Sequence, residues 1–279
     1  MKTDERTEDS DVFSHREIMN SLTTDWAGKE LHYLDETDST NMDAKQYARE
    51  GAPHGTVVVA DMQTAGRGRK GKTWQSPAGK AIYMTILLRP DFSPDKASML
   101  TLIMGLSVAQ AVAEIPDLHP GIKWPNDIVI DQKKICGILT EMEVQAEGAS
   151  YVVVGVGINV NNNSPDEFPE EIRQVATSLK IESGRSHSRA ALIGRVLSYF
   201  EKNYDTFVSS LDLSAVIEDY HKFLLNKDAE VRVLDPKGTY TGIARGINVA
   251  GELLVEKENG EITPVYAGEV SVRGLYGYV

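Results

Sequence analysis

A glycine-rich cationic run at residues 63–74 constrains this chain most, because it separates two apolar segments, 56–60 and 81–88. It reads QTAGRGRKGKTW and carries four cations within six positions. Glycine admits close backbone approach and positive φ, and arginine offers a planar fork that fits carboxylate or phosphate. The run therefore predicts a loop that closes over an anion such as a nucleotide phosphate.

The same run taken alone is equally compatible with a solvated basic turn that touches nucleic acid. It matches neither the G-x-x-x-x-G-K-[ST] loop nor a G-x-G-x-x-G that opens a helix. The whole chain carries a net charge of −12 and a pI near 5.0, whereas nucleic-acid binding needs a broad basic surface. Nucleic acid is therefore not expected as a partner.

Composition limits where the protein works. The 279 residues are 41% hydrophobic, as in ordinary soluble proteins. The single cysteine, Cys136, excludes an internal disulfide and suits a reducing cytoplasm. No apolar run approaches the roughly 20 residues that cross a bilayer, and the N-terminus is acidic. We expect a cytoplasmic protein with no membrane partner.

The order of apolar patterns predicts an α+β fold with two folded units. Residues 1–25 are expected to be an acidic, disordered tail, although 15–22 could form a short helix. In the unit at 26–225, strands are expected at 56–60, 81–88, 134–144 and 151–160, and helices at 41–50, 94–115, 188–207 and 213–225. Because strands and helices do not alternate regularly, an α+β arrangement is favoured over a doubly wound sheet.

The unit at 226–279 has a different pattern. Short alternating segments are punctuated by glycine turns, at 230–234, 240–247, 253–257 and 263–266. This pattern predicts a small β-barrel or sandwich.

Residues 123–127, Lys-Trp-Pro-Asn-Asp, are a second candidate ligand site. They lie between two expected strands, and the proline forces a stiff turn. A lysine, an amide and a carboxylate would then meet a charged ligand at one strand edge. Alternatively, Asn126 and Asp127 could be turn residues that bond their own backbone.

Two later strands also carry polar groups. Alternation in the strand at 134–144 lets Lys134 point into a cleft while Lys133 points to solvent. In the strand at 151–160, Gly155 and Gly157 indicate close approach of a ligand or of backbone, and Asn159 adds a polar group. The six histidines have no metal-ligand spacing, so a zinc site is not expected.

Taken together and in this order, these segments resemble the biotin–protein ligases, from about residue 26 to residue 273. The resemblance implies a class II synthetase-like catalytic domain at 26–225 with a mixed central sheet, and an SH3-like barrel at 226–279. It implies that biotin and ATP give biotinyl-5'-AMP, with Mg²⁺ on the nucleotide. The biotinyl group then passes to one lysine of a biotin carboxyl carrier domain, as in acetyl-CoA carboxylase.

The resemblance also implies roles for individual residues. The expected catalytic residues are Lys134 and Arg69. The expected biotin-binding residues are Ser39, Thr40, Asn41, Gln63, Gly66, Arg67, Arg69, Lys134 and Gly137. The expected ATP-binding residues are Arg69, Lys70, Lys72, Trp74, Lys123, Asn126, Asn159 and Arg273, and Asn126 and Asp127 are the expected metal ligands. For Trp74, anchoring the loop and plain packing are alternatives to direct contact with ATP.

Two departures and two alternatives qualify this resemblance. Lys70 and Lys72 stand where arginines are common in the family, which keeps the charge but loses the bidentate geometry. Too few residues precede the catalytic body for a winged helix-turn-helix, so repressor activity is not expected. The resemblance also implies that the protein forms a homodimer. The alternatives are a lipoate–protein ligase and a non-catalytic, biotin-binding regulator.

Overall fold

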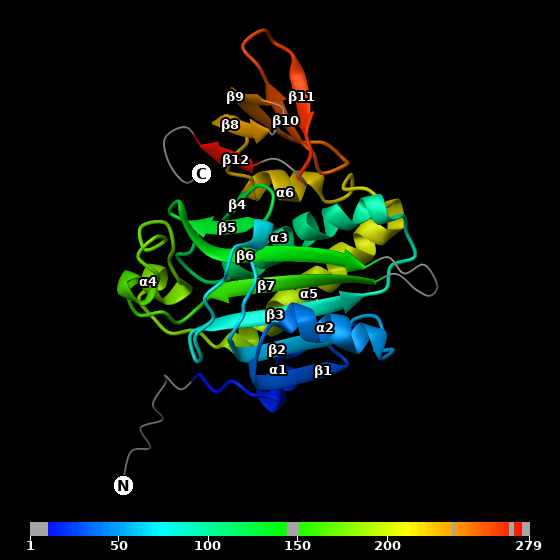
Figure 1. The fold of residues 1–279 in the computed structure, drawn as a ribbon, viewed down its shortest axis with the longest axis vertical. Coiled ribbons are helices and arrows are strands. Elements are labelled where there is room, and N and C mark those ends of the chain that lie inside the picture. Colours follow the sequence, from blue (N-terminus) through cyan, green and yellow to red (C-terminus); the bar gives the residue numbers. More distant parts are fainter. Residues whose placement is uncertain (1–10, 144–150, 236–237, 268–270, 275–279) are drawn as a thin grey trace.

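Two sheets organise the molecule (Figure 1), and they follow one another along the chain. The computed structural model describes residues 11–143, 151–235 and 238–267, and the backbone of 271–274. The larger sheet has seven strands in the order β1-β2-β3-β7-β6-β5-β4, and the smaller has five in the order β11-β10-β9-β8-β12.

The larger sheet is mixed. Its strands are β1 (Leu31–Thr37), β2 (Val57–Gln63), β3 (Ala81–Leu88), β4 (Gly121–Lys123), β5 (Asp127–Ile130), β6 (Lys133–Glu143) and β7 (Tyr151–Asn159). Only β1 and β2 pair in parallel, and the other neighbours are antiparallel. All eight residues of β3 are buried, as expected for a central strand that is covered on both faces.

Helices cover the two faces of this sheet unequally (Figure 1). Within the described residues, the helix on one face is α2 (Thr40–Arg49), whose Ala44 and Ala48 pack on Val58 and Leu87. The other face carries the main core, built on α1 (His15–Ser21), α3 (Ala97–Ala113) and α5 (Arg189–Ser210). The pocket described below opens on the α2 face.

Shorter helices lie in the connections. They are η1 (Arg69–Gly71), η2 (Pro94–Lys96), η3 (Pro165–Glu167), α4 (Leu179–Ser183) and α6 (Ile217–Phe223). The helix expected at 213–225 is therefore only the seven residues of α6.

One helical stretch among the described residues, 94–113, is long and apolar enough to cross a membrane. The length of this stretch contradicts the expectation that no apolar run approaches the roughly 20 residues that cross a bilayer. It is nevertheless a core helix, because 72% of its most apolar window is buried inside the protein.

The smaller sheet is antiparallel throughout. It consists of β8 (Glu230–Asp235), β9 (Gly238–Ile247), β10 (Leu253–Glu256), β11 (Ile262–Val265) and β12 (Ser271–Gly274), the last of which sequence analysis did not identify. The sheet is consistent with the expected SH3-like unit. Trp124, which follows β4 of the larger sheet, hydrogen-bonds to the smaller unit. Its indole Nε1 donates to the Gly251 carbonyl at 3.1 Å, and its backbone N–H donates to Asn226 Oδ1 at 2.7 Å.

The expectation of a disordered tail over residues 1–25 is wrong for its second half. Ile18 of α1 is fully buried in the main core. Asp11 forms an ion pair with the buried Arg189, and the backbone N–H of Arg189 donates to the same carboxylate at 3.0 Å. The sequence did not predict this contact, because Arg189 lies 178 residues away from Asp11 in the chain. Residues 1–10 lie outside the described part of the chain.

Candidate active site

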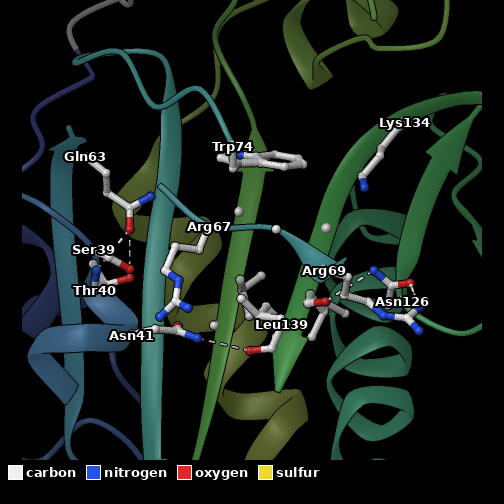
Figure 2. A pocket seen from close by; sticks show the side chains of 16 residues that line it. Ser39, Thr40, Asn41, Gln63, Arg67, Arg69, Trp74, Asn126, Lys134 and Leu139 are labelled. Atoms are coloured by element: carbon white, nitrogen blue, oxygen red, sulfur yellow. Dashed lines mark hydrogen bonds between the residues drawn. The ribbon is translucent and has the colours of Figure 1, made fainter. Parts of the chain in front are cut away.

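A pocket lies where the start of α2, the end of β2 and the middle of β6 and β7 meet beneath the cationic loop (Figure 2). Its volume is about 480 Å³, including the space that opens to solvent. The lining residues are Ser39, Thr40, Asn41, Gln63, Arg67, Gly68, Arg69, Trp74, Asn126, Lys134, Gly137, Ile138, Leu139, Gly155, Val156 and Gly157.

Three polar side chains without charge, Ser39, Thr40 and Gln63, form the wall of the pocket next to α2, here called the uncharged end, and Arg67 lies at its border. Ser39 is the N-cap residue of α2, its side chain makes no capping hydrogen bond, and it lines the pocket. The Thr40 backbone N–H donates to Gln63 Oε1 at 3.0 Å, and Gln63 Nε2 donates to Ser76 Oγ at 2.9 Å. The helix start and the end of β2 are thereby fixed to each other, and their polar side chains line the same wall.

The opposite end is charged (Figure 2). The Lys134 ammonium lies 2.6 Å from Asp127 Oδ1, and Asn126 Nδ2 donates to the same oxygen at 3.0 Å. Lys134 lines the pocket, while Lys133 is exposed. The prediction from strand alternation is therefore confirmed.

Arg69 connects the cationic loop to both sheets. One guanidinium nitrogen, Nη1, donates to Asn126 Oδ1 at 2.7 Å, and Nη2 donates to the Ala267 carbonyl of the smaller unit at 2.6 Å. Burial lowers the pKa of Arg69, and the charge of Asp127 opposes that shift. The group still carries its charge, because arginine is not deprotonated in proteins.

Arg67 approaches the pocket from the mouth and is more exposed than Arg69. Its Nη1 lies 3.6 Å from Glu141 Oε1, and Glu141 also accepts from Lys45 Nζ and Asn41 Nδ2, each at 2.8 Å. Burial favours the neutral carboxyl, but these hydrogen bonds and charges outweigh burial and lower the pKa of Glu141. A charged Glu141 therefore holds Arg67 next to α2.

Trp74 lies across the middle of the pocket (Figure 2), directly over two glycines. A Cβ atom at Gly157 would lie 2.9 Å from the Trp74 ring, and one at Gly137 would lie 3.0 Å from it. The Lys134 ammonium is 5.1 Å from the ring centroid, within the range of a cation–π contact. The strand glycines thus admit the indole. The close approach inferred from Gly157 is present, but the group that approaches is a side chain and not a ligand or backbone.

Several expected ligand residues of the cationic loop do not line the pocket. Gly66 is buried behind it, where a Cβ atom would meet the Trp74 carbonyl at 2.3 Å. Lys70 and Lys72 are exposed, and Lys70 has the positive φ of 56°. An irregular loop has no periodicity that could show which of its cations point inward, so sequence analysis could not separate these residues from Arg67 and Arg69.

Two expected ATP-binding residues outside the loop, Lys123 and Asn159, do not line the pocket, and the position of the Arg273 side chain is not tested. Lys123 is 7% exposed and does not line the pocket. Asn159 is buried, and its Nδ2 donates to the Thr177 carbonyl at 3.0 Å. The backbone of Arg273 pairs with Arg232 in the smaller sheet, but the side chain of Arg273 lies outside the described part of the structure.

Asn126 and Asp127, the expected metal ligands, are not joined by further ligand side chains in the described structure. The described residues contain no group of three or more histidine, cysteine, aspartate or glutamate side chains that could hold a metal ion. Asp127 Oδ1 already accepts from Lys134 and Asn126. These two residues do not make a metal site by themselves.

Sequence analysis did not identify several residues that line the pocket. Gly68, Ile138, Leu139 and Val156 line the wall. Gly155 also lines it and was noted only for close approach. A Cβ atom there would lie 2.0 Å from Asn41 Oδ1. The glycine in a β-branched strand was the signal for this contact, but only the fold identifies Asn41 as its partner.

Comparison with known proteins is consistent with this arrangement. Residues 33–159 match the Biotin/lipoate A/B protein ligase family, and residues 229–273 match the Biotin protein ligase C terminal domain. The bifunctional ligase/repressor BirA of Bacillus spizizenii is 39% identical over 259 residues, which cover 93% of this chain and 79% of the relative. This chain belongs to the biotin protein ligase family.

Other biotin protein ligases cover a similar extent. The biotin–[acetyl-CoA-carboxylase] ligase of Mycobacterium tuberculosis is 34% identical over 87% of this chain and 88% of its own length. Biotin protein ligase from Aquifex aeolicus, solved in complex with biotin and ATP, has a TM-score of 0.77 at 34% identity and covers 88% of this chain and 99% of its own. The expected family and fold class are confirmed.

Proposed function

We propose that this chain activates biotin with ATP and transfers the biotinyl group to a lysine of a carboxyl carrier domain. The observation that carries the proposal is that polar, uncharged side chains gather at the α2 end of the pocket, whereas Lys134, Asp127 and Arg69 gather at the other end. Biotin has the same division, with a neutral cyclic urea at one end and a carboxylate at the other. The structural neighbour from Aquifex aeolicus was solved with biotin and ATP.

The uncharged end suits the ring system of biotin. Ser39, Thr40 and Gln63 present hydroxyl and amide groups there, and Arg67 lies beside Asn41 at the border of this group (Figure 2). A neutral urea offers both N–H donors and a carbonyl acceptor, which such groups can satisfy without a charge. Apolar lining from Leu139 suits the remainder of the ring.

The cationic end suits the reacting atoms. In the first step, a carboxylate oxygen of biotin attacks the α-phosphorus of ATP, the bond to the β-phosphate oxygen breaks, and pyrophosphate leaves. Lys134 and Arg69 would neutralise the charge that collects on the phosphoryl oxygens, and Arg67, held beside Glu141, would fold over biotin and the adenylate. Trp74 and the loop that carries it exclude water from the mixed anhydride.

In the second step, the ε-amine of the acceptor lysine attacks the carbonyl carbon of the anhydride. An amide bond forms, the carbon–oxygen bond to phosphate breaks, AMP leaves, and the amine loses a proton. The same cations then stabilise the departing AMP.

The proposal includes Mg²⁺, which would bind together with the phosphates of ATP. Mg²⁺ needs only one or two carboxylates when phosphate oxygens and water complete its shell, and Asp127 could supply one. Lys70 and Lys72 reach phosphates only if the loop rearranges when nucleotide binds, so their role is proposed for the liganded state.

The proposal extends to the partners and the location. The acceptor is a biotin carboxyl carrier domain of acetyl-CoA carboxylase or a related enzyme, and the ligase works as a homodimer in the cytoplasm. We expect no binding to membranes, since the apolar helix α3 lies in the core. We also expect no binding to operator DNA and no repressor activity, because the net charge of −12 disfavours nucleic acid.

ATP–pyrophosphate exchange with biotin and with lipoate in parallel tests the first step. We expect exchange with biotin alone. Exchange with lipoate would instead support a lipoate–protein ligase, and biotin binding without exchange would support a non-catalytic regulator. Transfer of labelled biotin to a purified carrier domain, with a carrier that lacks its lysine as control, tests the second step.

A further inference from the structure

A chain of buried hydrogen bonds runs beneath the uncharged end of the pocket, and Thr85 of β3 is at its centre. The Thr85 side chain is fully buried and does not line the pocket. Its hydroxyl oxygen lies 2.8 Å from Thr40 Oγ1 and 2.7 Å from Asn41 Oδ1. A buried hydroxyl is costly unless it is hydrogen-bonded, so this position is built for polar contact.

The orientation of Asn41 is determined by its other partners. Its Nδ2 donates to the Glu141 carboxylate at 2.8 Å and to the Leu139 carbonyl at 3.3 Å. Both of these groups can only accept. The Asn41 Oδ1 atom therefore faces Thr85, and an amide oxygen can only accept a hydrogen bond.

Thr85 has one hydroxyl hydrogen for two neighbouring oxygens. Asn41 Oδ1 cannot donate, so the hydrogen of Thr85 goes to Asn41. The 2.8 Å contact between the two threonine hydroxyls is then made by the hydrogen of Thr40. The Thr40 hydroxyl oxygen also lies 3.2 Å from Gln63 Oε1, a second possible acceptor for its hydrogen. The contact with Thr85 is shorter, and Gln63 Oε1 stays satisfied without that hydrogen, because the Thr40 backbone N–H donates to it at 3.0 Å.

This assignment determines what Thr40 offers a ligand. With its hydrogen directed toward the Thr85 oxygen, the Thr40 hydroxyl presents only lone pairs to the pocket that it lines. We propose that Thr85 is a positioning and specificity-determining residue, which orients the Thr40 hydroxyl as an acceptor for a ligand N–H. The inference rests on the proposed function, in which that N–H belongs to the cyclic urea of biotin; the dithiolane ring of lipoate has none.

The test replaces Thr85 by valine, which has nearly the same shape but no hydroxyl, and by serine, which keeps the hydroxyl. Calorimetric titration measures the dissociation constant for biotin, and a non-hydrolysable ATP analogue is titrated as well. We expect T85V to weaken biotin binding roughly tenfold or more, as a site loses a buried polar partner. T85S should bind biotin almost as the wild type does, and both variants should bind the ATP analogue unchanged.

Three results would overturn the inference: wild-type affinity in T85V, equal weakening in T85S and T85V, or a parallel loss of affinity for the ATP analogue. The fitted stoichiometry counts folded molecules, so a destabilised T85V still yields its dissociation constant, and T85A is a second variant without the hydroxyl. If the wild type bound no biotin, the proposed function would fail together with this inference. Unchanged binding in T85V beside normal wild-type binding would refute the role of Thr85 alone.

Discussion

The Lys134 ammonium lies 2.6 Å from the Asp127 carboxylate, at the cationic end of the pocket. The partner holds the lysine in position, so that its charge is ready where the phosphoryl group would react. Lys134→Ala should therefore slow adenylation by a factor on the order of 10² to 10³, as when a preorganised donor is removed. Single-turnover formation of biotinyl-5'-AMP measures this loss.

Lys133→Ala is the matched control, because Lys133 is the neighbouring lysine of the same strand and is exposed. It should leave adenylation unchanged. Normal adenylation by a folded Lys134→Ala protein would remove Lys134 from the mechanism.

Asp127 has two possible roles, which a second substitution separates. If it positions Lys134, Asp127→Asn should slow adenylation by roughly 10- to 100-fold at every magnesium concentration, because misplaced catalytic groups cost rates of this order. If it is instead a magnesium ligand, the concentration of Mg²⁺ that gives half-maximal rate should rise, and excess Mg²⁺ should restore the rate. A magnesium titration of both proteins distinguishes the two roles, and we expect the first.

Gly155 should tolerate no side chain. A Cβ atom there would lie 2.0 Å from Asn41 Oδ1, so Gly155→Ala should displace the buried amide and lower the free energy of unfolding by about 1–3 kcal/mol. The control is Gly105→Ala in α3, where the nearest atom to a new Cβ is 3.7 Å away. That change should raise stability by about 0.5–1 kcal/mol, since glycine is unfavourable inside a helix. Urea unfolding measures both, and equal effects would contradict the packing argument.

The carboxylate of Glu141 should give the protein a pH-dependent stability. Its pKa is lowered in the folded state, because hydrogen bonds from Lys45 and Asn41 outweigh the effect of burial. A lowered folded pKa stabilises the protein above the unfolded value of about 4.3, and this contribution is lost as pH falls through the folded value.

Glu141→Gln should therefore be destabilised relative to the wild type by about 1 kcal/mol at pH 7, and the difference should shrink below about pH 4.3. Urea unfolding across this pH range checks the trend. Glu36→Gln, at an exposed carboxylate, is the control and should show little difference at any pH. A constant difference between Glu141→Gln and the wild type would refute the electrostatic explanation.

The amino-acid sequence alone determined the central strands and the segments that meet in the pocket. The strand at 81–88 was predicted with its observed bounds, since a strand covered on both faces is apolar without interruption. Strand alternation gave the direction of Lys134, and the glycines at 155 and 157 indicated a close approach. These features depend on local periodicity or on the absence of a side chain, which the sequence displays directly.

Only the tertiary structure decided which groups act together. It separated Arg67 and Arg69, which line the pocket, from Lys70 and Lys72, which do not. It paired Asp127 with Lys134, Asp11 with Arg189, and Thr85 with Thr40 and Asn41. An irregular loop has no period that fixes side-chain direction, and partners from different elements are brought together only when the core packs.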